Sequence, residues 1–449
     1  MAVTVMTVTL NVSYMKFYDR NKEIEILQNI ESRSATSAQM TTVVGRRRVG
    51  KTTLLKVAFK QTPVLYFFIA KKNEALLCNE FTLEVQEKLG FSMGNFQRFA
   101  DLFQTIMQLS EKINFTLVID EFQEFENINR SVFSDMQNIW DSFKDKSKLN
   151  LILCGSIYSM MKRIFENSKE PLFGRATSKI MLKPFDIKTI KEILSDYNTD
   201  YSNEDLLAFY MVTGGVAKYI ELLVICEAFT KSAILDEMFK DNSFFLNEGR
   251  DVLIEEFGKD YGNYFSILSL IASSKNDRSS IESILNISVG GYLDRLENDF
   301  NIIKRIRPFM AKEGSRNNRY RIEDNFLNFW FRFNYKYRSA IEISNYDYVR
   351  DIVERDYEGF SGIVLEKYFR QKLIEAKQYS DIQGYWDNKG ENEIDIVAVN
   401  EMDMRLEFYE VKRNPKKINI ELLKKKSINI TSKFPRYIIE YRGLSLEDM

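Results

Sequence analysis

The sequence contains no histidine. This absence excludes Ser-His-Asp and Cys-His triads, histidine-ligated zinc sites and HExxH metalloproteases, since each of them needs an imidazole. Any chemistry must therefore use carboxylates, lysine, arginine or hydroxyl groups. The three cysteines, Cys78, Cys154 and Cys226, lie far apart and form no CxxC pair, so no disulfide framework is expected. Free thiols are typical of a reducing compartment, and we expect a cytoplasmic protein.

Long apolar runs and chain-breaking residues are also scarce. The chain has no stretch of about 18 consecutive apolar residues and no basic start followed by an apolar core, so we expect neither a membrane span nor a signal peptide. With only 6 prolines and 19 glycines, no linker-like segment marks a domain boundary. The 63 basic residues nearly balance the 64 acidic ones, so any nucleic-acid-binding surface must be local.

The hydrophobic pattern divides the chain into regions. A length of 449 residues, 45% of them hydrophobic, predicts about three globular domains. In the first third, short apolar runs alternate with helical patterns, which indicates a parallel sheet. These runs are 40–44, 64–69, 115–119 and 150–154.

The middle of the chain has a helical period over residues 186–300. Two strand-like runs, 302–307 and 319–322, then flank a basic loop at 311–318. Helices followed by a small hairpin indicate a winged helix. Such a domain either contacts DNA or serves as a spacer between protein surfaces, and the sequence leaves both interpretations open.

The last part of the chain predicts a unit with a sheet of its own, formed by a helix at 356–377 and strands at 393–399 and 405–412. The aromatic run that precedes it has helical spacing, which favours a core-packing helix over a base-stacking platform. Its members are Phe326, Phe329, Trp330, Phe331 and Phe333.

A phosphate-binding loop is the most specific motif. The sequence from Gly45 to Thr52 fits GxxxxGK[ST], follows the apolar strand that ends at Val44, and opens a helix expected at 53–59. In such loops backbone N–H groups surround the phosphates of ATP, the lysine places its charge on the terminal phosphates, and the hydroxyl binds Mg²⁺. The predicted nucleotide-binding residues are Gly45, Arg46, Arg47, Arg48, Val49, Gly50, Lys51, Thr52 and Thr53.

The tips of two later strands supply the remaining groups of an ATPase site. Asp120 and Glu121 follow the apolar run 115–119. Asp120 would hold the magnesium ion through water, and Glu121 would polarise the attacking water. Ser156 follows another apolar run and can reach a terminal phosphate or that water.

Several ordered motifs over about residues 15–225 resemble the archaeal-type ATPase family, which belongs to the signal-transducing (STAND-like), AAA+-related P-loop NTPases. The motifs are Phe17-Tyr18-Asp19-Arg20 with Glu23, Asp120-Glu121-Phe122-Gln123, Pro171-Leu172-Phe173-Gly174-Arg175, and Thr213-Gly214-Gly215-Val216-Ala217-Lys218-Tyr219. The resemblance implies that Arg20 lies near the adenine and that Arg175 senses the terminal phosphate. It also implies that Gly214 and Gly215 begin a helical lid.

The resemblance has further consequences. Ala217 stands where the family usually has proline, which affects the adenine-side contact of that turn and not the phosphate chemistry. Arg175 would meet the phosphate in its own subunit or in a neighbour, and in the second case the protein is a homo-oligomer. Family members tend to begin just before the FxxR segment, so we expect residues 1–14 to be an N-terminal extension.

A second cluster of chemically active residues lies near the C-terminus. If the strands at 393–399 and 405–412 form a hairpin centred at Met402 and Asp403, Asp395 and Glu410 fall opposite each other and share a face. Lys412, two residues beyond Glu410, points to that same face. Two carboxylates can hold a divalent cation while the lysine stabilises or deprotonates the water that attacks a phosphodiester.

This arrangement resembles the PD-(D/E)xK nucleases, whose restriction-endonuclease-like fold is often fused to archaeal-type ATPases. Within that pattern Glu366, on the preceding helix, would complete the metal-side carboxylates, although a solvated helix face explains it equally well. The motif is short, so a degenerate nuclease fold that cuts nothing is the alternative.

Local positive charge accompanies these motifs and favours DNA as a partner. Residues 411–442 contain ten basic residues against two acidic ones, Glu421 and Glu440. The predicted hairpin adds Lys304, Arg305, Arg307, Lys312, Arg316, Arg319 and Arg321.

We therefore expect an α/β protein with a P-loop NTPase parallel sheet, a helical/winged-helix domain and a small α/β restriction-endonuclease-like domain. The expected ranges are 1–14, 15–225, 226–340 and 341–449. Two functions fit this organisation. The first is an ATP-hydrolysing switch that controls DNA binding and metal-dependent cleavage. The second is a nucleotide-regulated module that binds DNA or protein and carries an inactive nuclease-like domain.

Overall fold

The computed structural model describes residues 15–258, 261–312, 314–315, 317–387 and 392–449. These residues form two compact units. The smaller unit comprises 19–184 with 298–301, and the larger comprises 15–18, 185–297 and 302–449. The expected extension at 1–14 and the hairpin cation Arg316 lie outside the described residues.

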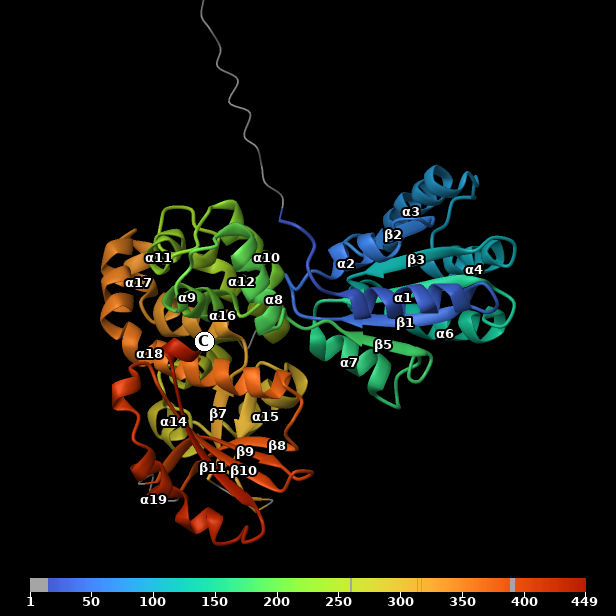
Figure 1. The fold of residues 1–449 in the computed structure, drawn as a ribbon. Helices are drawn as coiled ribbons and strands as arrows, with labels where there is room; N and C mark the ends of the chain where they lie inside the picture. Colours follow the sequence, from blue (N-terminus) through green and yellow to red (C-terminus); the bar gives the residue numbers. More distant parts are fainter. Residues whose placement is uncertain (1–14, 259–260, 313, 316, 388–391) are drawn as a thin grey trace, which may run out of the picture. The chain divides into compact units, whose positions relative to one another are not determined.

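The smaller unit is built on a five-stranded sheet in the order β2-β3-β4-β1-β5, in which every pair of neighbours is parallel (Figure 1). Four of its strands match the predicted apolar runs, whereas β5 is too short and too polar to stand out in the sequence. The strands are β1 Gln39–Val44, β2 Val64–Phe68, β3 Phe115–Asp120, β4 Leu149–Gly155 and β5 Ser178–Met181.

Helices cover both faces of this sheet, because its strand residues alternate between two apolar clusters. Leu117 and Leu151 belong to the larger cluster, and their neighbours Val118 and Ile152 belong to the smaller one. The main helices of the unit are α1 Asn21–Ser34, α2 Lys51–Ala58, α3 Glu74–Leu89, α4 Phe99–Ser110, α6 Ser131–Phe143 and α7 Tyr158–Glu166. The predicted P-loop NTPase sheet is confirmed.

The larger unit begins with a helical region that ends in a short antiparallel hairpin, β6 Ile303–Ile306 with β7 Arg319–Ile322. The aromatic run that follows lies in α16 (Asn325–Phe329) and the helical turn Trp330–Tyr335, and all of its predicted members are buried. It packs into the core, as expected. The preceding helices are α8 Ile187–Tyr197, α9 Asn203–Thr213, α10 Ala217–Ile225, α11 Lys231–Met238, α12 Phe245–Phe257, α13 Tyr261–Ala272, α14 Arg278–Leu285 and α15 Gly290–Asp294.

A four-stranded sheet in the order β11-β10-β9-β8 completes the larger unit. The long helix α18 precedes the sheet and begins at Tyr346, earlier than predicted, where Asn345 accepts a hydrogen bond from the Tyr348 N–H. Strands β10 and β11 are parallel and are joined through α19, and the other pairs are antiparallel. The bounds are α18 Tyr346–Glu375, β8 Asp381–Trp386, β9 Glu393–Asn400, β10 Arg405–Lys412, α19 Ile420–Thr431 and β11 Ile438–Ser445.

The helices α8 to α10, expected to be a lid within 15–225, belong to the larger unit. The turn after α9 explains this, because Gly215 accepts a hydrogen bond from the Phe185 N–H at 2.8 Å and Asn325 donates to the Tyr210 carbonyl at 3.0 Å. The expected domain boundaries themselves stay a prediction. None of the helices in the described ranges combines the length and apolar character that crossing a bilayer requires.

Candidate functional site

The P-loop turns between β1 and α2 with the backbone geometry that its glycines allow. Gly50 has φ of 99° and precedes the first residue of α2, a conformation that glycine adopts without strain. A Cβ on Gly45 would lie 2.8 Å from the Leu182 carbonyl oxygen. The helix begins at Lys51, so its first N–H groups face the loop, the arrangement that binds phosphate in other proteins.

Lys51 is buried beneath this loop. Its Nζ donates to the carbonyl oxygens of Gly45 at 2.7 Å and Arg46 at 3.4 Å. Burial lowers the pKa of Lys51, while the nearby Glu121 and Asp120 carboxylates oppose that change and favour the charged form. The two loop carbonyl groups thus fix the position of the Lys51 ammonium group.

Asp120 and Thr52 are linked by a tyrosine. The Tyr66 hydroxyl, on β2, donates to the Asp120 carboxylate and lies 3.4 Å from the Thr52 hydroxyl. A carboxylate and a hydroxyl on neighbouring elements are the ligand set that Mg²⁺ takes in P-loop ATPases. The two residues predicted to bind magnesium are therefore brought together.

Glu121 is held by two neutral donors. Its Oε2 accepts hydrogen bonds from Ser156 Oγ at 2.8 Å and Gln123 Nε2 at 2.5 Å. Glu121 itself has φ of 53°, a left-handed conformation that turns the chain sharply at the end of β3. Ser156, at the tip of β4, thus contacts the predicted water-polarising carboxylate directly.

Arg20 and Arg175 have different surroundings in the smaller unit. Arg20 is buried and donates to the Lys183 carbonyl at 2.7 Å. Arg175 donates to the Phe173 carbonyl at 2.9 Å and forms an ion pair with Asp141 at 3.1 Å. Gly214 and Gly215 lie in the larger unit, where a Cβ on Gly215 would be 2.3 Å from the Phe185 carbonyl oxygen. Close packing therefore accounts for Gly215.

The C-terminal cluster forms on the β9–β10 hairpin. The observed register pairs Tyr409 with Ile396, and one step further along the same register places Glu410 opposite Asp395. This is the alignment that a hairpin centred at Met402 and Asp403 predicts.

The three predicted side chains converge. Asp395 Oδ2 accepts hydrogen bonds from the Val411 N–H at 2.7 Å and Lys412 Nζ at 3.1 Å. Lys412 Nζ lies 3.8 Å from Glu410 Oε1, and Glu410 Oε2 accepts from the Asn419 N–H at 2.6 Å. Two carboxylates and a lysine thus share one point at the end of the hairpin.

Glu366 lies close to this cluster but is paired with a cation of its own. Arg370 donates to Glu366 Oε1 at 2.7 Å and to the Asp395 carbonyl oxygen at 2.8 Å. Burial raises the pKa of the Glu366 carboxyl; Arg370 opposes this shift, and Asp395 adds to it. Within the described part of the chain, no three His, Cys, Asp or Glu side chains gather closely enough to hold a metal ion. The cluster therefore offers a cation the pair Asp395 and Glu410.

Sequence reasoning missed Tyr66, Gln123 and Arg370. Gln123 belongs to a motif quoted above, but its amide had no assigned partner. Tyr66 sits in a strand where an aromatic residue is ordinary. Arg370 lies four residues after Glu366 on one helix, a spacing that is typical of an ordinary ion pair on a helix surface and gives no sign of a site.

Comparisons with known proteins agree with the smaller unit's fold. Residues 17–223 match a family model described as an ATPase domain predominantly from Archaea. Residues 330–427 match a family of archaeal and bacterial proteins of unknown function. An uncharacterized protein of Methanocaldococcus jannaschii is 27% identical over 435 residues, which cover 94% of each chain.

Two solved structures resemble this chain. The Walker-type ATPase of Pyrococcus abyssi superimposes with a TM-score of 0.55 and 19% identity, covering 70% of this chain and 96% of that one. The ORC2 protein of Aeropyrum pernix gives a TM-score of 0.48 and 13% identity over 77% of this chain and 97% of that one. The family match supports a P-loop ATPase domain, and the parallel sheet is typical of P-loop NTPases. Its site residues remain predictions from the motif and geometry.

Proposed function

We propose that this protein is an ATP-driven switch, in which ATP binding and hydrolysis at the P-loop control DNA binding and metal-dependent phosphodiester cleavage by the C-terminal sheet. The observation that carries this proposal is the convergence of Asp395, Glu410 and Lys412 in a chain that also has a P-loop ATPase domain. Neither part alone indicates a switch. The fusion of an ATPase domain to a candidate cleavage site favours one, because ATP hydrolysis could then control the activity of that site.

The ATPase half of the proposal assigns a role to each side chain near the P-loop. Thr52 and Asp120 would hold Mg²⁺, which neutralises phosphate charge when bound. Lys51 binds the terminal phosphates, and Glu121 orients the attacking water. Ser156 and Gln123 keep the Glu121 carboxylate in place through their hydrogen bonds.

Three further assignments in this half rest on the family resemblance. Arg20 would contact the adenine side, and Gly214 and Gly215 would belong to the lid. Arg175 would sense the terminal phosphate, which requires it to exchange its ion pair with Asp141 for the nucleotide. If it does so in a neighbouring subunit, the active protein is a homo-oligomer.

The cleavage half uses the hairpin cluster. Asp395 and Glu410 would hold a divalent cation, which activates water and stabilises phosphate charge when bound. Lys412 is positioned to stabilise the attacking water or the developing negative charge. Glu366 would assist on the metal side once its pairing with Arg370 is relaxed.

A second function fits one observation. Arg370 is paired with Glu366, so only Asp395 and Glu410 are left to bind a cation, whereas the nuclease pattern has three carboxylates. This favours a nucleotide-regulated binding module whose nuclease-like domain cuts nothing. The first function predicts cleavage of nucleic acid, and the second predicts binding of DNA or of a protein without cleavage.

The experiment incubates purified protein with plasmid, linear and single-stranded DNA and with RNA, in Mg²⁺ or Mn²⁺, with and without ATP. Wild-type protein should cut at least one substrate, and Asp395→Ala should cut none. Binding without cleavage under every condition would favour the binding module.

A further inference from the structure

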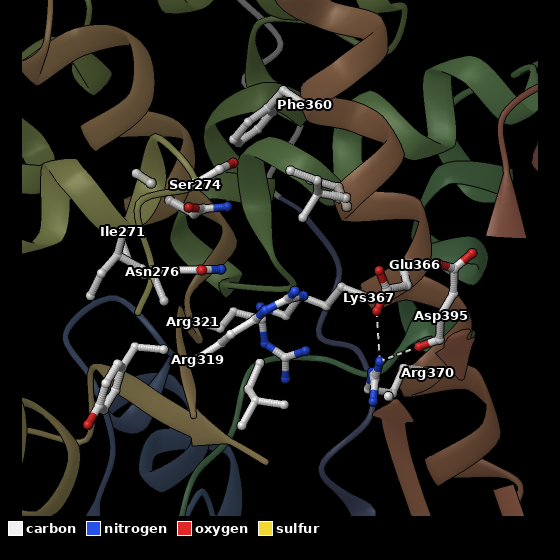
Figure 2. A pocket seen from close by; sticks show the side chains of 18 of the residues that line it. Ile271, Ser274, Asn276, Arg319, Arg321, Phe360, Glu366, Lys367, Arg370 and Asp395 are labelled. Carbon is white, nitrogen blue, oxygen red and sulfur yellow. Dashed lines mark hydrogen bonds and ion pairs between the residues drawn. The ribbon is translucent and has the colours of Figure 1, made fainter. Parts of the chain in front are cut away.

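Two cavities of the larger unit share three cationic side chains. The narrower cavity has a volume of about 150 Å³ and reaches Glu366 and Asp395 of the hairpin cluster (Figure 2). The wider one is a groove of about 700 Å³. Arg321 on β7 and Lys367 and Arg370 on α18 line both of them. The same three cations therefore border both the groove and the cavity that reaches Asp395.

Arg370 is the most constrained of these cations. Its side chain is 10% exposed, and one terminal nitrogen is held by Glu366 and the Asp395 carbonyl, as Figure 2 shows. Its Nε is buried and has no hydrogen-bond partner among the described residues. A buried donor without a partner is costly, so an anionic ligand at this point would gain a charge-assisted hydrogen bond.

The wide groove adds further positive charge. It is lined by six cationic and four acidic side chains, and two of the acids, Glu297 and Glu323, form ion pairs with Arg305 and Arg321. Lys304 and Arg307 are exposed and have no ion pair with a residue that the structure describes. These two are the cations most available to an incoming ligand.

Aromatic rings line the same groove. Phe309 and Phe434 stack with ring centroids 5.9 Å apart, and Tyr437 packs edge-on to Phe434 at 5.1 Å. Phe434 and Tyr437 are partly exposed. Cations beside exposed aromatic faces are the combination that binds unpaired bases and their backbone together.

We propose that the groove binds a single strand of nucleic acid, with one phosphate at Arg321, Lys367 and Arg370 and the preceding backbone along Lys304 and Arg307. A duplex keeps its bases stacked inside and would offer the rings nothing, whereas a single strand can place a base on Tyr437. The proposal rests on the proposed function only in its consequence that the bound strand is led to Asp395.

Binding is measured separately from cleavage, in EDTA, with fluorescent single-stranded DNA, single-stranded RNA and a duplex of the same sequence. Lys304→Glu and Arg307→Glu are tested singly and together. Lys188→Glu is the matched control, because Lys188 is an exposed lysine of the same unit outside the groove. Thermal unfolding of each variant verifies that the fold is retained.

We expect at least one single strand to bind more tightly than the duplex. The double variant should weaken that binding about tenfold at 0.1 M salt, and each single variant should reduce the slope of log affinity against log salt by about 0.7. Lys188→Glu should change neither quantity, and Tyr437→Ala should weaken the single strand and spare any duplex binding.

Tighter binding of the duplex, or unchanged single-strand binding in the double variant, would overturn the proposal. Preference for DNA or for RNA identifies the strand and supports it in either case. Loss of the proposed cleavage activity leaves a different signature, namely intact binding in EDTA and no cutting after cations are added.

Discussion

In the smaller unit, the side-chain hydrogen bonds to Asp120 and Glu121 come from hydroxyl and amide groups, and the nearby Lys51 donates to loop carbonyls instead. In the larger unit, Lys412 donates directly to Asp395. Neutral donors orient a carboxylate and leave its charge for a cation. A lysine brings a charge of its own into the cluster. The two sites should therefore respond differently when a single partner is removed.

The largest expected effects lie in the ATPase site. Lys51→Ala should abolish tight ATP binding, because the loop backbone cannot replace a buried ammonium that the Gly45 carbonyl holds. Glu121→Gln should retain ATP binding and lower hydrolysis by about 10²- to 10⁴-fold, the usual contribution of a residue that assists proton transfer. Equilibrium ATP binding and phosphate release separate the two phenotypes.

Hydrolysis at the wild-type rate in Glu121→Gln would contradict the assigned role of this carboxylate. Ser156→Ala provides an intermediate control, since it removes one hydrogen bond to Glu121 and keeps the carboxylate.

The hairpin site should show a second division of roles. Asp395→Ala should eliminate both cation binding and cleavage, whereas Lys412→Ala should eliminate cleavage and leave cation binding intact. Calorimetric titration with Mn²⁺ and an oligonucleotide cleavage assay measure the two properties. ATP hydrolysis without DNA should be unchanged in both variants, because Thr52 and Asp120 belong to the other unit. Cleavage by Lys412→Ala at the wild-type rate would remove the lysine from the mechanism.

A smaller effect is expected when a neutral donor is removed. Tyr66→Phe deletes the hydroxyl that bonds to Asp120, and loss of such an outer partner typically weakens a metal site by about 10- to 100-fold. The Mg²⁺ concentration for half-maximal ATPase should therefore rise about tenfold, while the rate at saturating Mg²⁺ stays near that of wild type. A reduced rate with unchanged Mg²⁺ dependence would indicate a different role for Tyr66.

The smallest expected effect on nucleotide affinity is at Gly215. Its φ is 81° and an added Cβ would lie 2.3 Å from the Phe185 carbonyl oxygen, so Gly215→Ala should destabilise the fold by about 1–3 kcal/mol. Gly359→Ala is the control, because a Cβ there meets nothing within 4 Å. Thermal unfolding and ATP titration are compared. Lower ATP affinity with unchanged stability would indicate that Gly215 acts in nucleotide binding, as the family resemblance implies.

Local sequence determined how much of each site was predictable. The P-loop and Asp120-Glu121 are contiguous motifs after apolar strands, and the parallel sheet gathers their ends at one edge. The hairpin register was predictable because a turn fixes the pairing of the strands that it joins. Tyr66 was not predictable, since its contact with Asp120 spans neighbouring strands that are far apart in sequence.

The remaining misses have similar causes. Strands β8 and β11 lie at the two opposite edges of the C-terminal sheet and carry polar residues, so their apolar pattern in the sequence is weak. The packing of α8 to α10, whose domain assignment stays a prediction, depends on contacts such as those of Gly215 with Phe185. Arg370 joins Glu366 to the Asp395 backbone. Helical spacing predicts the contact with Glu366 but not the one with Asp395.

The most direct test of an ATP-controlled nuclease is cleavage of a single-stranded oligonucleotide in Mn²⁺, with and without ATP, by wild-type, Lys51→Ala and Asp395→Ala proteins. The account predicts cation-dependent cleavage by wild type that ATP alters, cleavage by Lys51→Ala that ATP does not alter, and none by Asp395→Ala. Equal cleavage by Asp395→Ala and wild type, or no cleavage by wild type with any cation and nucleotide, would contradict it.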